Sequence, residues 1–165
     1  MAVRPIVKIP SAVLGRKAVK VKNFDAALER LAGDMVDTLR STTGVGLAAP
    51  QIGVGEKIIV VEYSEEHETP ELYIVVNPEI TDASDEMVTG IEGCLSVPDL
   101  IGEVDRHERI IVKGQDIKGK ALKFKPEGWL ARIFQHEIDH LDGIIYTQRA
   151  ARVWRPGENE AADEV

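Results

Sequence analysis

The chain has 165 residues, of which 44% are hydrophobic and 29% charged, and this balance is typical of a globular protein of one domain. Its net charge of −8 argues against direct DNA binding, because phosphate contacts need clustered lysine and arginine. A membrane-spanning helix and a multi-cysteine metal site are also excluded, since no stretch approaches the roughly 20 apolar residues of such a helix and Cys94 is the only cysteine.

Charge is distributed unevenly between the two ends of the chain. Residues 1–22 are basic, whereas residues 156–165 are acidic and lack apolar periodicity. The basic residues 1–22 could contact an anionic partner such as ribosomal RNA transiently. A solvated strand and loop is the favoured interpretation of such a charge run. The acidic end is expected to be disordered. We therefore divide the chain into one folded domain, 1–150, and a C-terminal tail, 151–165.

The first element expected along the chain is a helix over 24–40. Its apolar residues recur at three- and four-residue spacing, which gives one buried face. Asn23 is the expected N-cap of this helix. A glycine turn follows at Gly44–Gly46. Buried strands are then expected at 58–63 and 72–77, joined by a polar hairpin loop, and in two runs within 104–124.

A second helix is expected to begin near Pro126, run to about Leu141 and end at Gly143. Its apolar residues lie nearly all round the helix axis, which is typical of a helix in the middle of a domain. Taken together, the elements predict an α+β fold with short strands packed around one central helix.

The central helix contains the pattern H-E-x-x-H at residues 136–140. His136 and His140 lie one turn apart on one face, so both imidazoles can bind one cation. Glu137 lies about 100° round the helix from His136, beside the cation, which suits a general base acting on a water molecule. Two histidines that merely face solvent are disfavoured, since a buried helix would then bury ionisable groups for no gain. The pattern alone does not choose among the classes of metal-dependent hydrolase.

A catalytic metal site of this kind needs a third protein ligand and an open position. One candidate is Cys94, and the other is a glutamate of the tail, Glu158 or Glu160, at a spacing that resembles thermolysin-like proteases. The tail has no apolar periodicity to hold it against the domain, so Cys94 is favoured. A lone cysteine is more often a small buried hydrophobe, but Gly93 permits close approach of the backbone and the two histidines need a partner.

Three segments together resemble peptide deformylase: Gly-Val-Gly-Leu-Ala-Ala-Pro-Gln at 44–51, Glu-Gly-Cys-Leu-Ser at 92–96 and Gln-His-Glu-Ile-Asp-His at 135–140. They occur in the family's order, and the resemblance runs from Arg4 to about Thr147. It implies a central metal-binding helix enclosed by short, mostly antiparallel β-sheets, together with an N-terminal helix. It also implies an enzyme that hydrolyses the N-formyl group from the formyl-methionine of newly synthesised polypeptides and releases formate. The single domain would then be catalytic.

The resemblance assigns roles at the reaction centre. The family's metal ligands correspond to Cys94, His136 and His140. Glu137 corresponds to the acid/base, which takes a proton from the attacking water and returns it to the departing amine. The side chain of Gln51 and the backbone N–H of Leu95 correspond to the groups that stabilise the oxyanion, and a neutral amide donor suits that task.

Further residues are implied at the substrate site. They are Val45, Gly46, Glu92, Gly93, Trp129 and Ile133. In the family Glu92 also pairs with an arginine, for which Arg106 is the match here. Trp129 and Arg132 depart from the aliphatic or small residues of some members, and this departure is expected to reshape the rim of the methionine pocket.

The resemblance implies one divalent metal ion, Fe²⁺ physiologically, with Zn²⁺, Ni²⁺ or Co²⁺ as ions that a purified sample can carry. Thiolate and imidazole ligands by themselves suit several of these ions. The implied partners are N-formylmethionyl nascent peptides, with a transient ribosome contact, which an acidic tail is not expected to provide. A cytoplasmic location is expected, because the family-like region starts almost at Met1 and leaves no room for a transit peptide.

Two other functions remain open from the residues alone. A small metalloprotease that uses a tail glutamate would be impaired by deletion of 156–165, whereas a deformylase would be impaired by Cys94→Ala. A non-catalytic module that binds formyl peptides or metal would show no turnover. Glu137→Gln would therefore change no measurable rate.

Overall fold

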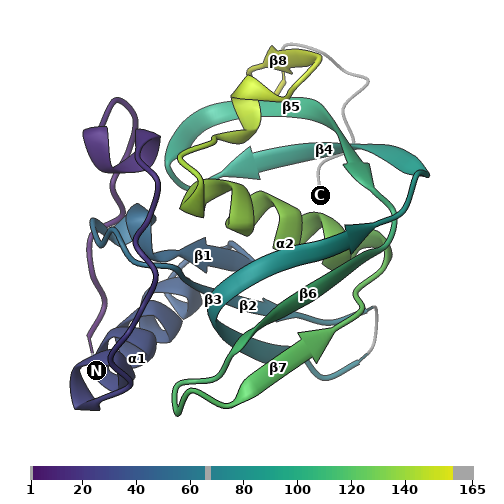
Figure 1. The fold of residues 1–165 in the computed structure, drawn as a ribbon. Coiled ribbons are helices and arrows are strands. Elements are labelled where there is room, and N and C mark those ends of the chain that lie inside the picture. The colour runs from purple at the N-terminus through teal and green to yellow at the C-terminus, as the bar shows by residue number, and fades with distance from the viewer. Residues whose placement is uncertain (1, 66–67, 158–165) are drawn as a thin grey trace.

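The chain combines two α-helices with two β-sheets in a computed structural model that describes residues 2–65 and 68–157 (Figure 1). The α-helices are α1 (Ala26–Arg40) and α2 (Gly128–Leu141). The strands are β1 (Gly46–Ala48), β2 (Ile58–Tyr63), β3 (Glu71–Ala83), β4 (Met87–Cys94), β5 (Val97–His107), β6 (Ile110–Gln115), β7 (Ala121–Phe124) and β8 (Arg152–Trp154). Short 3₁₀ helices lie at η1 (Ala12–Gly15), η2 (Ala49–Ile52) and η3 (Tyr146–Gln148). The predicted α+β class is confirmed.

The two sheets enclose α2 from opposite sides. One sheet has five strands in the order β1-β2-β3-β6-β7, and the other has three in the order β4-β5-β8. All neighbouring strands are antiparallel. In Figure 1, α2 lies between the three-stranded sheet and the five-stranded sheet. The arrangement that the family resemblance implied, a central helix between antiparallel sheets, is therefore confirmed.

Strand β2 has a buried side chain on each of its two faces, which explains its continuous apolar run. Ile59 and Val61 belong to the core cluster that contains residues of α2, whereas Ile58 and Val60 belong to the cluster that contains residues of α1. Successive side chains of a strand point to opposite faces. The five-stranded sheet is therefore covered by α2 on one face and by α1 on the other.

Helix α1 begins two residues later than the sequence predicts. Its N-cap is Asp25, whose side chain accepts a hydrogen bond of 3.1 Å from the backbone N–H of Leu28. The prediction of Asn23 as the cap was wrong. Asparagine and aspartate are equally good caps, so their identity could not decide between the two positions.

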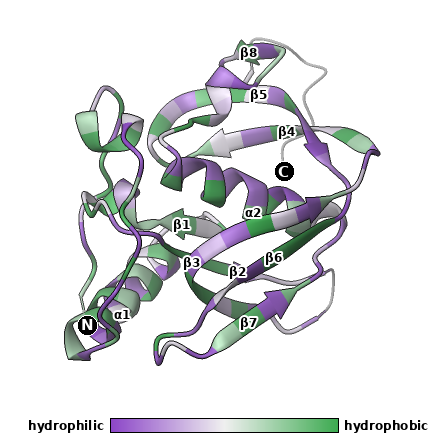
Figure 2. Ribbon diagram, viewed as in Figure 1, coloured by the Kyte–Doolittle hydropathy of each residue, from purple (hydrophilic) through white to green (hydrophobic). Residues whose placement is uncertain are grey.

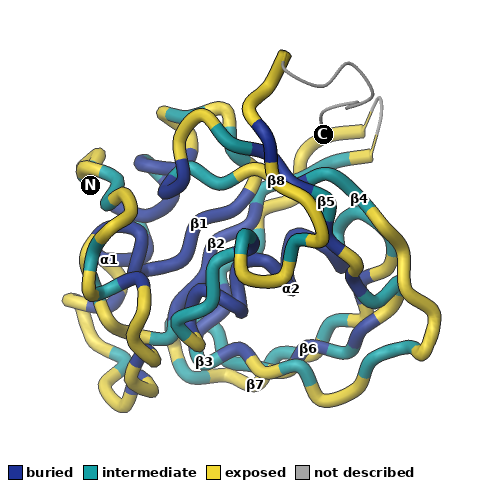
Figure 3. The backbone as a smooth tube through the Cα atoms, turned by 90° about the horizontal axis from the view of Figure 1, so that it is seen from above, coloured by how far each residue is buried: buried dark blue, intermediate teal, exposed yellow. Residues whose placement is uncertain are grey.

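Helix α2 begins at Gly128, and Glu127 rather than Pro126 occupies the position before it. It ends at Leu141, and Gly143 adopts φ 75°, a left-handed conformation that confirms the predicted stop. Residues 131–141 are all buried. Figure 2 shows that both hydrophobic and hydrophilic residues occur along this helix, and Figure 3 shows it among the buried segments of the molecule. The central position of the helix therefore buries polar side chains.

The long hairpin of β4 and β5 is the largest feature absent from the predictions. Its register pairs Glu92 with Gly102 and Gly93 with Ile101, and it shifts at Cys94, which pairs with Val97. Much of β4 is exposed or half-buried, so it lacks the apolar alternation by which a strand is predicted. This hairpin carries Cys94 at the end of β4 and places it beside α2.

Within the segment that the sequence assigns to the tail, strand β8 pairs with β5, joining Trp154 to Ile101. The acidic residues 158–165 lie outside the described residues, so the expected disorder of the tail stays a prediction. None of the helices in the described part of the chain has the length and apolar character needed to cross a membrane.

Candidate metal centre

Helix α2 and the end of β4 bring one sulfur and two imidazoles together. The Sγ atom of Cys94 lies 3.3 Å from Nε2 of His140. One ligand atom each from Cys94, His136 and His140 can be chosen so that all three lie within 4.8 Å of one another. The structure thus brings together the three residues that the sequence predicts as metal ligands. The alternative ligands, Glu158 and Glu160, lie outside the described residues.

The donor set of these three residues fits a divalent transition-metal ion. Metal–sulfur bonds of about 2.3 Å and metal–nitrogen bonds of about 2.1 Å place the ligand atoms of one ion roughly 3–4 Å apart. Glu137 Oε1, beside these ligands, is one of four buried side-chain polar atoms without a hydrogen-bond partner among the described residues, and such an atom is uncommon unless a further group binds nearby. Thiolate and imidazole ligands suit zinc, iron, nickel and cobalt.

The carboxylate of Glu92 orients His136 from behind. Its Oε1 lies 2.8 Å from Nδ1 of His136, so Nδ1 donates to it and Nε2 is left to face Cys94. Arg106 donates two hydrogen bonds of 2.9 Å to Glu92, and Arg132 donates a third of 2.7 Å. Burial by itself raises the pKa of Glu92, but the hydrogen bonds from Arg106 and His136 outweigh burial and hold that pKa below its usual range. Glu92 is therefore an ionised anchor, and its predicted pairing with Arg106 is confirmed.

A second carboxylate extends this network toward the surface. Asp139 on α2 accepts hydrogen bonds of 2.7 Å from Arg106 and of 2.6 and 3.0 Å from Arg149. The side chain of Arg149 is 46% exposed, whereas that of Arg106 is 4% exposed. A continuous chain of ion pairs therefore links the protein surface to the residue that orients His136.

The imidazoles differ in how their surroundings act on protonation. Burial lowers the pKa of His140 to about 3, with further contributions from the positive charges of His136 and Arg106. Burial also lowers the pKa of His136, but hydrogen bonds with Cys94 and Glu92 raise it well above its ordinary value. These surroundings favour the neutral form of His140 that a metal ligand needs, whereas an ion bound by His136 would have to displace a proton from it.

Glu137 is buried beside the three candidate ligands. Burial raises the pKa of its carboxyl to about 7, against the opposing effect of the positive charge on His136. A Cβ atom at Gly46 of β1 would lie 2.5 Å from Oε2 of Glu137. Only glycine permits this approach, so the first strand of the five-stranded sheet makes room for the carboxylate. A carboxyl with a pKa near neutrality is suited to accept and return a proton.

The amide of Gln51 is fixed so that its N–H groups face the sulfur. Its Oε1 accepts a hydrogen bond of 2.9 Å from the backbone N–H of Ala48. Its Nε2 donates to Oγ of Ser96 at 3.2 Å and lies 3.6 Å from Sγ of Cys94. Because Oε1 is already used, the donor side of the amide is the side presented to the centre.

A cavity of about 430 Å³ opens onto these groups. Predicted site residues that line it are Val45, Gly46, Gln51, Glu92, Gly93, Cys94, Leu95, Trp129, Ile133, His136 and Glu137. His140 lies behind the cavity and is not among its lining residues. Arg132, which was expected to shape the rim of the pocket, also lines the cavity. Residues at the cavity that the sequence did not assign to the site are Thr43, Gly44, Tyr63 and Ile91.

Two of these unassigned residues had a signal in the sequence. Tyr63 ends a predicted strand beside the glycine turn, and Ile91 precedes Glu92 on β4. Arg132 was expected at the rim of the pocket, but it is 4% exposed and bound to Glu92. Arg132 does line the cavity, but its pairing with a buried carboxylate on β4, far from it in the sequence, was not predicted.

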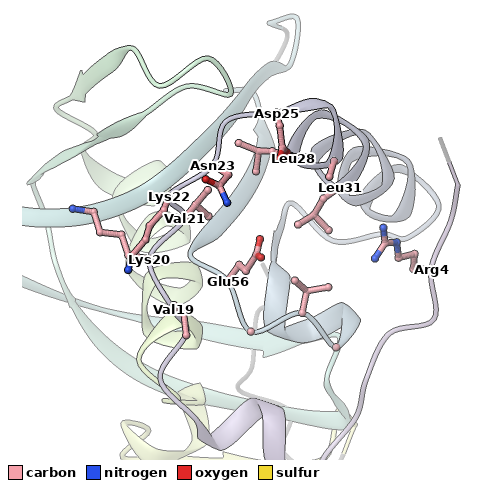
Figure 4. A pocket seen from close by; sticks show the side chains of 14 residues that line it. Arg4, Val19, Lys20, Val21, Lys22, Asn23, Asp25, Leu28, Leu31 and Glu56 are labelled. Atoms are coloured by element: carbon pink, nitrogen blue, oxygen red, sulfur yellow. Dashed lines mark hydrogen bonds between the residues drawn. The ribbon is translucent and has the colours of Figure 1, made fainter.

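A larger cavity of about 840 Å³ lies between the N-terminal segment and α1 (Figure 4). Its lining includes the apolar residues Val21, Leu28 and Leu31, with Glu56 projecting into it. Its lining residues include neither histidine nor cysteine. The smaller cavity, not the larger one, is therefore the candidate site.

The chain is similar to known proteins over almost its whole length. A family model described as polypeptide deformylase matches residues 3–155. The peptide deformylase of Natranaerobius thermophilus is 46% identical over 159 residues, covering 96% of this chain and 99% of the relative. That of Symbiobacterium thermophilum is 46% identical over 169 residues, covering 100% of this chain and 76% of the relative.

Solved structures agree with these matches. The peptide deformylase of Ehrlichia chaffeensis in complex with actinonin superposes with a TM-score of 0.87 at 38% identity, covering 92% of this chain and 91% of that chain. A class I type b peptide deformylase of Acinetobacter baumannii gives a TM-score of 0.86 at 38% identity, covering 90% and 99%.

Proposed function

Because the chain belongs to the polypeptide deformylase family, whose members are enzymes that remove the N-formyl group from nascent peptides, we propose that it does so by metal-dependent hydrolysis and releases formate. The observation that carries this proposal is the convergence of Cys94, His136 and His140 beside a buried carboxyl at the end of a cavity. Each side chain has a distinct task in the proposed reaction.

Cys94, His136 and His140 would hold one divalent ion. When bound there, such an ion acts as a Lewis acid toward the formyl oxygen and increases the acidity of a water molecule. Fe²⁺ is the proposed physiological ion, with Ni²⁺, Co²⁺ or Zn²⁺ as substitutes, because a thiolate and two imidazoles suit each of them. The hydrogen bond between Glu92 and Nδ1 of His136 keeps Nε2 of that ring directed into the centre.

Glu137 is the proposed carrier of the proton. Its carboxylate accepts a proton from the water that attacks the formyl carbon, and it returns the proton to the α-amine as the carbon–nitrogen bond breaks. Burial, which raises the pKa of Glu137 to about 7, matches its basicity to both steps. The absence of a side chain at Gly46 leaves room for the carboxylate beside β1.

The amide N–H of Gln51 is the proposed donor to the oxyanion, together with the backbone N–H of Leu95. The orientation of Gln51 supports this role, since the backbone N–H of Ala48 holds its oxygen and leaves its nitrogen toward Cys94. A donor that is already oriented needs no reorganisation during the reaction. Removal of one such donor costs about 3 kcal/mol of barrier height.

The cavity favours a substrate with an apolar first side chain. Ile91, Trp129 and Ile133 line it next to Glu137, and we propose that they receive the methionine side chain of N-formylmethionyl peptides. Val45 and Gly46 at the cavity edge would offer backbone hydrogen bonds to an extended peptide. We also propose a cytoplasmic location and a transient ribosome contact through the basic residues 1–22. Residues 156–165 are proposed to be dispensable for turnover.

The test is formate release from formyl-Met-Ala-Ser by protein that is loaded with Ni²⁺ in the absence of oxygen. We expect turnover by the wild type and a roughly 10²- to 10⁴-fold lower kcat for Glu137→Gln, which keeps the size of the side chain but cannot carry the proton. Absence of turnover by the Ni²⁺-loaded wild type would contradict the proposal. Equal turnover by Glu137→Gln would contradict the role of Glu137.

A further inference from the structure

Arg132 is a buried cation that the proposed reaction does not use. It lies on α2 one turn before His136, its side chain is 5% exposed, and it lines the cavity. Its Nη1 donates to Oε2 of Glu92 at 2.7 Å and to the carbonyl of Val104 at 2.8 Å. Its Nη2 donates to the carbonyl of Val88 at 2.6 Å. One guanidinium therefore connects α2 to β4, to β5 and to the carboxylate that orients His136.

Gly90 of β4 makes room for this guanidinium. A Cβ atom at position 90 would lie 2.7 Å from Cζ and 2.8 Å from Nε of Arg132, and the three atoms nearest to it all belong to Arg132. These distances are shorter than a van der Waals contact permits. The ring of Trp129 lies on another side, with its centroid 5.2 Å from Cζ. Gly90 and Arg132 therefore form a matched pair, in which the missing side chain of one permits the position of the other.

The two oxygens of Glu92 have different sets of partners. Oε1 accepts from His136 and from Nη2 of Arg106, whereas Oε2 accepts from Nε of Arg106 and from Arg132. Without Arg132, Oε2 would keep one partner, and Arg106 and His136 alone would hold the carboxylate. The carboxylate could then shift together with the Arg106 guanidinium, which would lengthen the hydrogen bond between Oε1 and Nδ1 of His136.

We propose that Arg132 is a positioning residue for the metal centre, which acts through Glu92 to hold the His136 ring with Nε2 toward Cys94, and that Gly90 is present to admit it. This inference rests on the proposed function, because it concerns the same centre. Loss of a hydrogen-bond partner behind a metal ligand typically weakens metal binding by roughly 10- to 100-fold. An arginine that served only to pack α2 against the hairpin would change the melting temperature without this loss of affinity.

The test compares Ni²⁺ dissociation constants, measured without oxygen by competition with a chromophoric chelator, and melting temperatures of the metal-free proteins. The variants are Arg132→Met, Gly90→Ala and the double variant. The control is Arg109→Met, because Arg109 makes an exposed ion pair of 3.7 Å with Glu86, away from the centre. We expect the dissociation constant to rise roughly 10- to 100-fold in Arg132→Met, to rise in Gly90→Ala, and to stay unchanged in the control.

The double variant shows whether Gly90→Ala acts through Arg132 or affects Ni²⁺ binding independently of it. Once the guanidinium is gone, the added methyl group at position 90 has nothing to displace, so the double variant should bind Ni²⁺ no more weakly than Arg132→Met alone. Effects that multiply in the double variant would overturn the pairing of Gly90 with Arg132. Dissociation constants within threefold of the wild type in both single variants would overturn the positioning role.

Arg132→Lys keeps the inference testable if Arg132→Met does not fold. Lysine retains the charge but lacks the planar fork that reaches both Glu92 and the Val88 carbonyl, so we expect an intermediate dissociation constant. An unchanged constant in both Arg132→Lys and Gly90→Ala would then overturn the inference. Failure of the proposed function looks different, since the wild type would bind Ni²⁺ without releasing formate from formyl-Met-Ala-Ser.

Discussion

The two sides of α2 meet the rest of the protein through opposite kinds of contact. Toward the five-stranded sheet, Phe134 and Ile138 belong to a cluster of buried apolar side chains. Toward the three-stranded sheet, the helix meets buried ions, in which Arg106 and Arg132 surround Glu92. The apolar cluster on that second side is much smaller and centres on Tyr146.

The apolar side of α2 is therefore expected to stabilise the fold, and the ionic side to position the groups of the metal centre. Burial of apolar side chains stabilises a fold directly, whereas buried ion pairs repay their desolvation only when their geometry is well satisfied. The ionic side of α2 is therefore weak support for the fold, but it fixes the directions of the side chains at the centre. We expect substitutions on the two sides to have separable effects on turnover and on stability.

The largest effect is expected from Cys94→Ala on the ionic side. Loss of the sulfur leaves two imidazoles, so Ni²⁺ binding and formate release should both be abolished. The metal-free protein should melt within a few degrees of the wild type, because Cys94 lies at the end of an edge strand. Calorimetry and the formyl-peptide assay measure the two properties. Retained turnover in this variant would contradict the role of Cys94 as a metal ligand.

Phe134→Ala tests the apolar side of the helix. Phe134 is fully buried and makes aromatic contacts with Tyr73 and Phe124, so its truncation should lower the free energy of unfolding by about 3–5 kcal/mol. Denaturant titration measures this loss. Leu72→Ala on the same sheet, where the side chain is 36% exposed, is the control and should change stability little. The folded Phe134→Ala protein should keep a kcat close to that of the wild type. A large loss of kcat in the folded variant would contradict the separation between the two sides of the helix.

Gln51→Ala should affect the reaction rather than the fold. Loss of the oriented amide donor should lower kcat by roughly 10²- to 10³-fold, with little change in KM. Gln148→Ala is the matched control, because Oε1 of Gln148 accepts only from the backbone N–H of Ile145 among the described residues. Steady-state kinetics with a formyl peptide separates kcat from KM. A change confined to KM would show that Gln51 binds substrate and does not stabilise the oxyanion.

The smallest effect is expected from removal of residues 156–165. The structure describes residues 156 and 157 of this segment, and neither belongs to a sheet that encloses α2. We therefore expect turnover and melting temperature to match those of the full chain. A protease that takes its third ligand from Glu158 or Glu160 would lose activity instead. The formyl-peptide assay on the truncated chain distinguishes the two outcomes.

The sequence predicted those parts of the molecule that have a local signal. The spacing of His136 and His140 and the apolar pattern around them defined α2, and the run Ile58–Tyr63 defined β2. Cys94 was chosen as the third ligand by its glycine neighbour and by elimination of the tail. The structure places it 3.3 Å from His140.

The remaining features depend on contacts between segments far apart in the chain. The hairpin of β4 and β5 has no apolar alternation over its half-exposed part, so it could not be recognised from periodicity. Arg132 was expected at the pocket rim, because nothing in its neighbourhood along the chain identifies Glu92 as its partner. Only the fold of β4 against α2 brings that carboxylate, and the space left by Gly90, to the arginine.

X-ray absorption spectroscopy of the Ni²⁺-loaded protein tests the central claim most directly, since it counts sulfur and nitrogen neighbours of the ion. We expect the ion to have one sulfur ligand, from Cys94, and two imidazole nitrogens, from His136 and His140. An ion with no sulfur neighbour in the wild-type protein would contradict that claim.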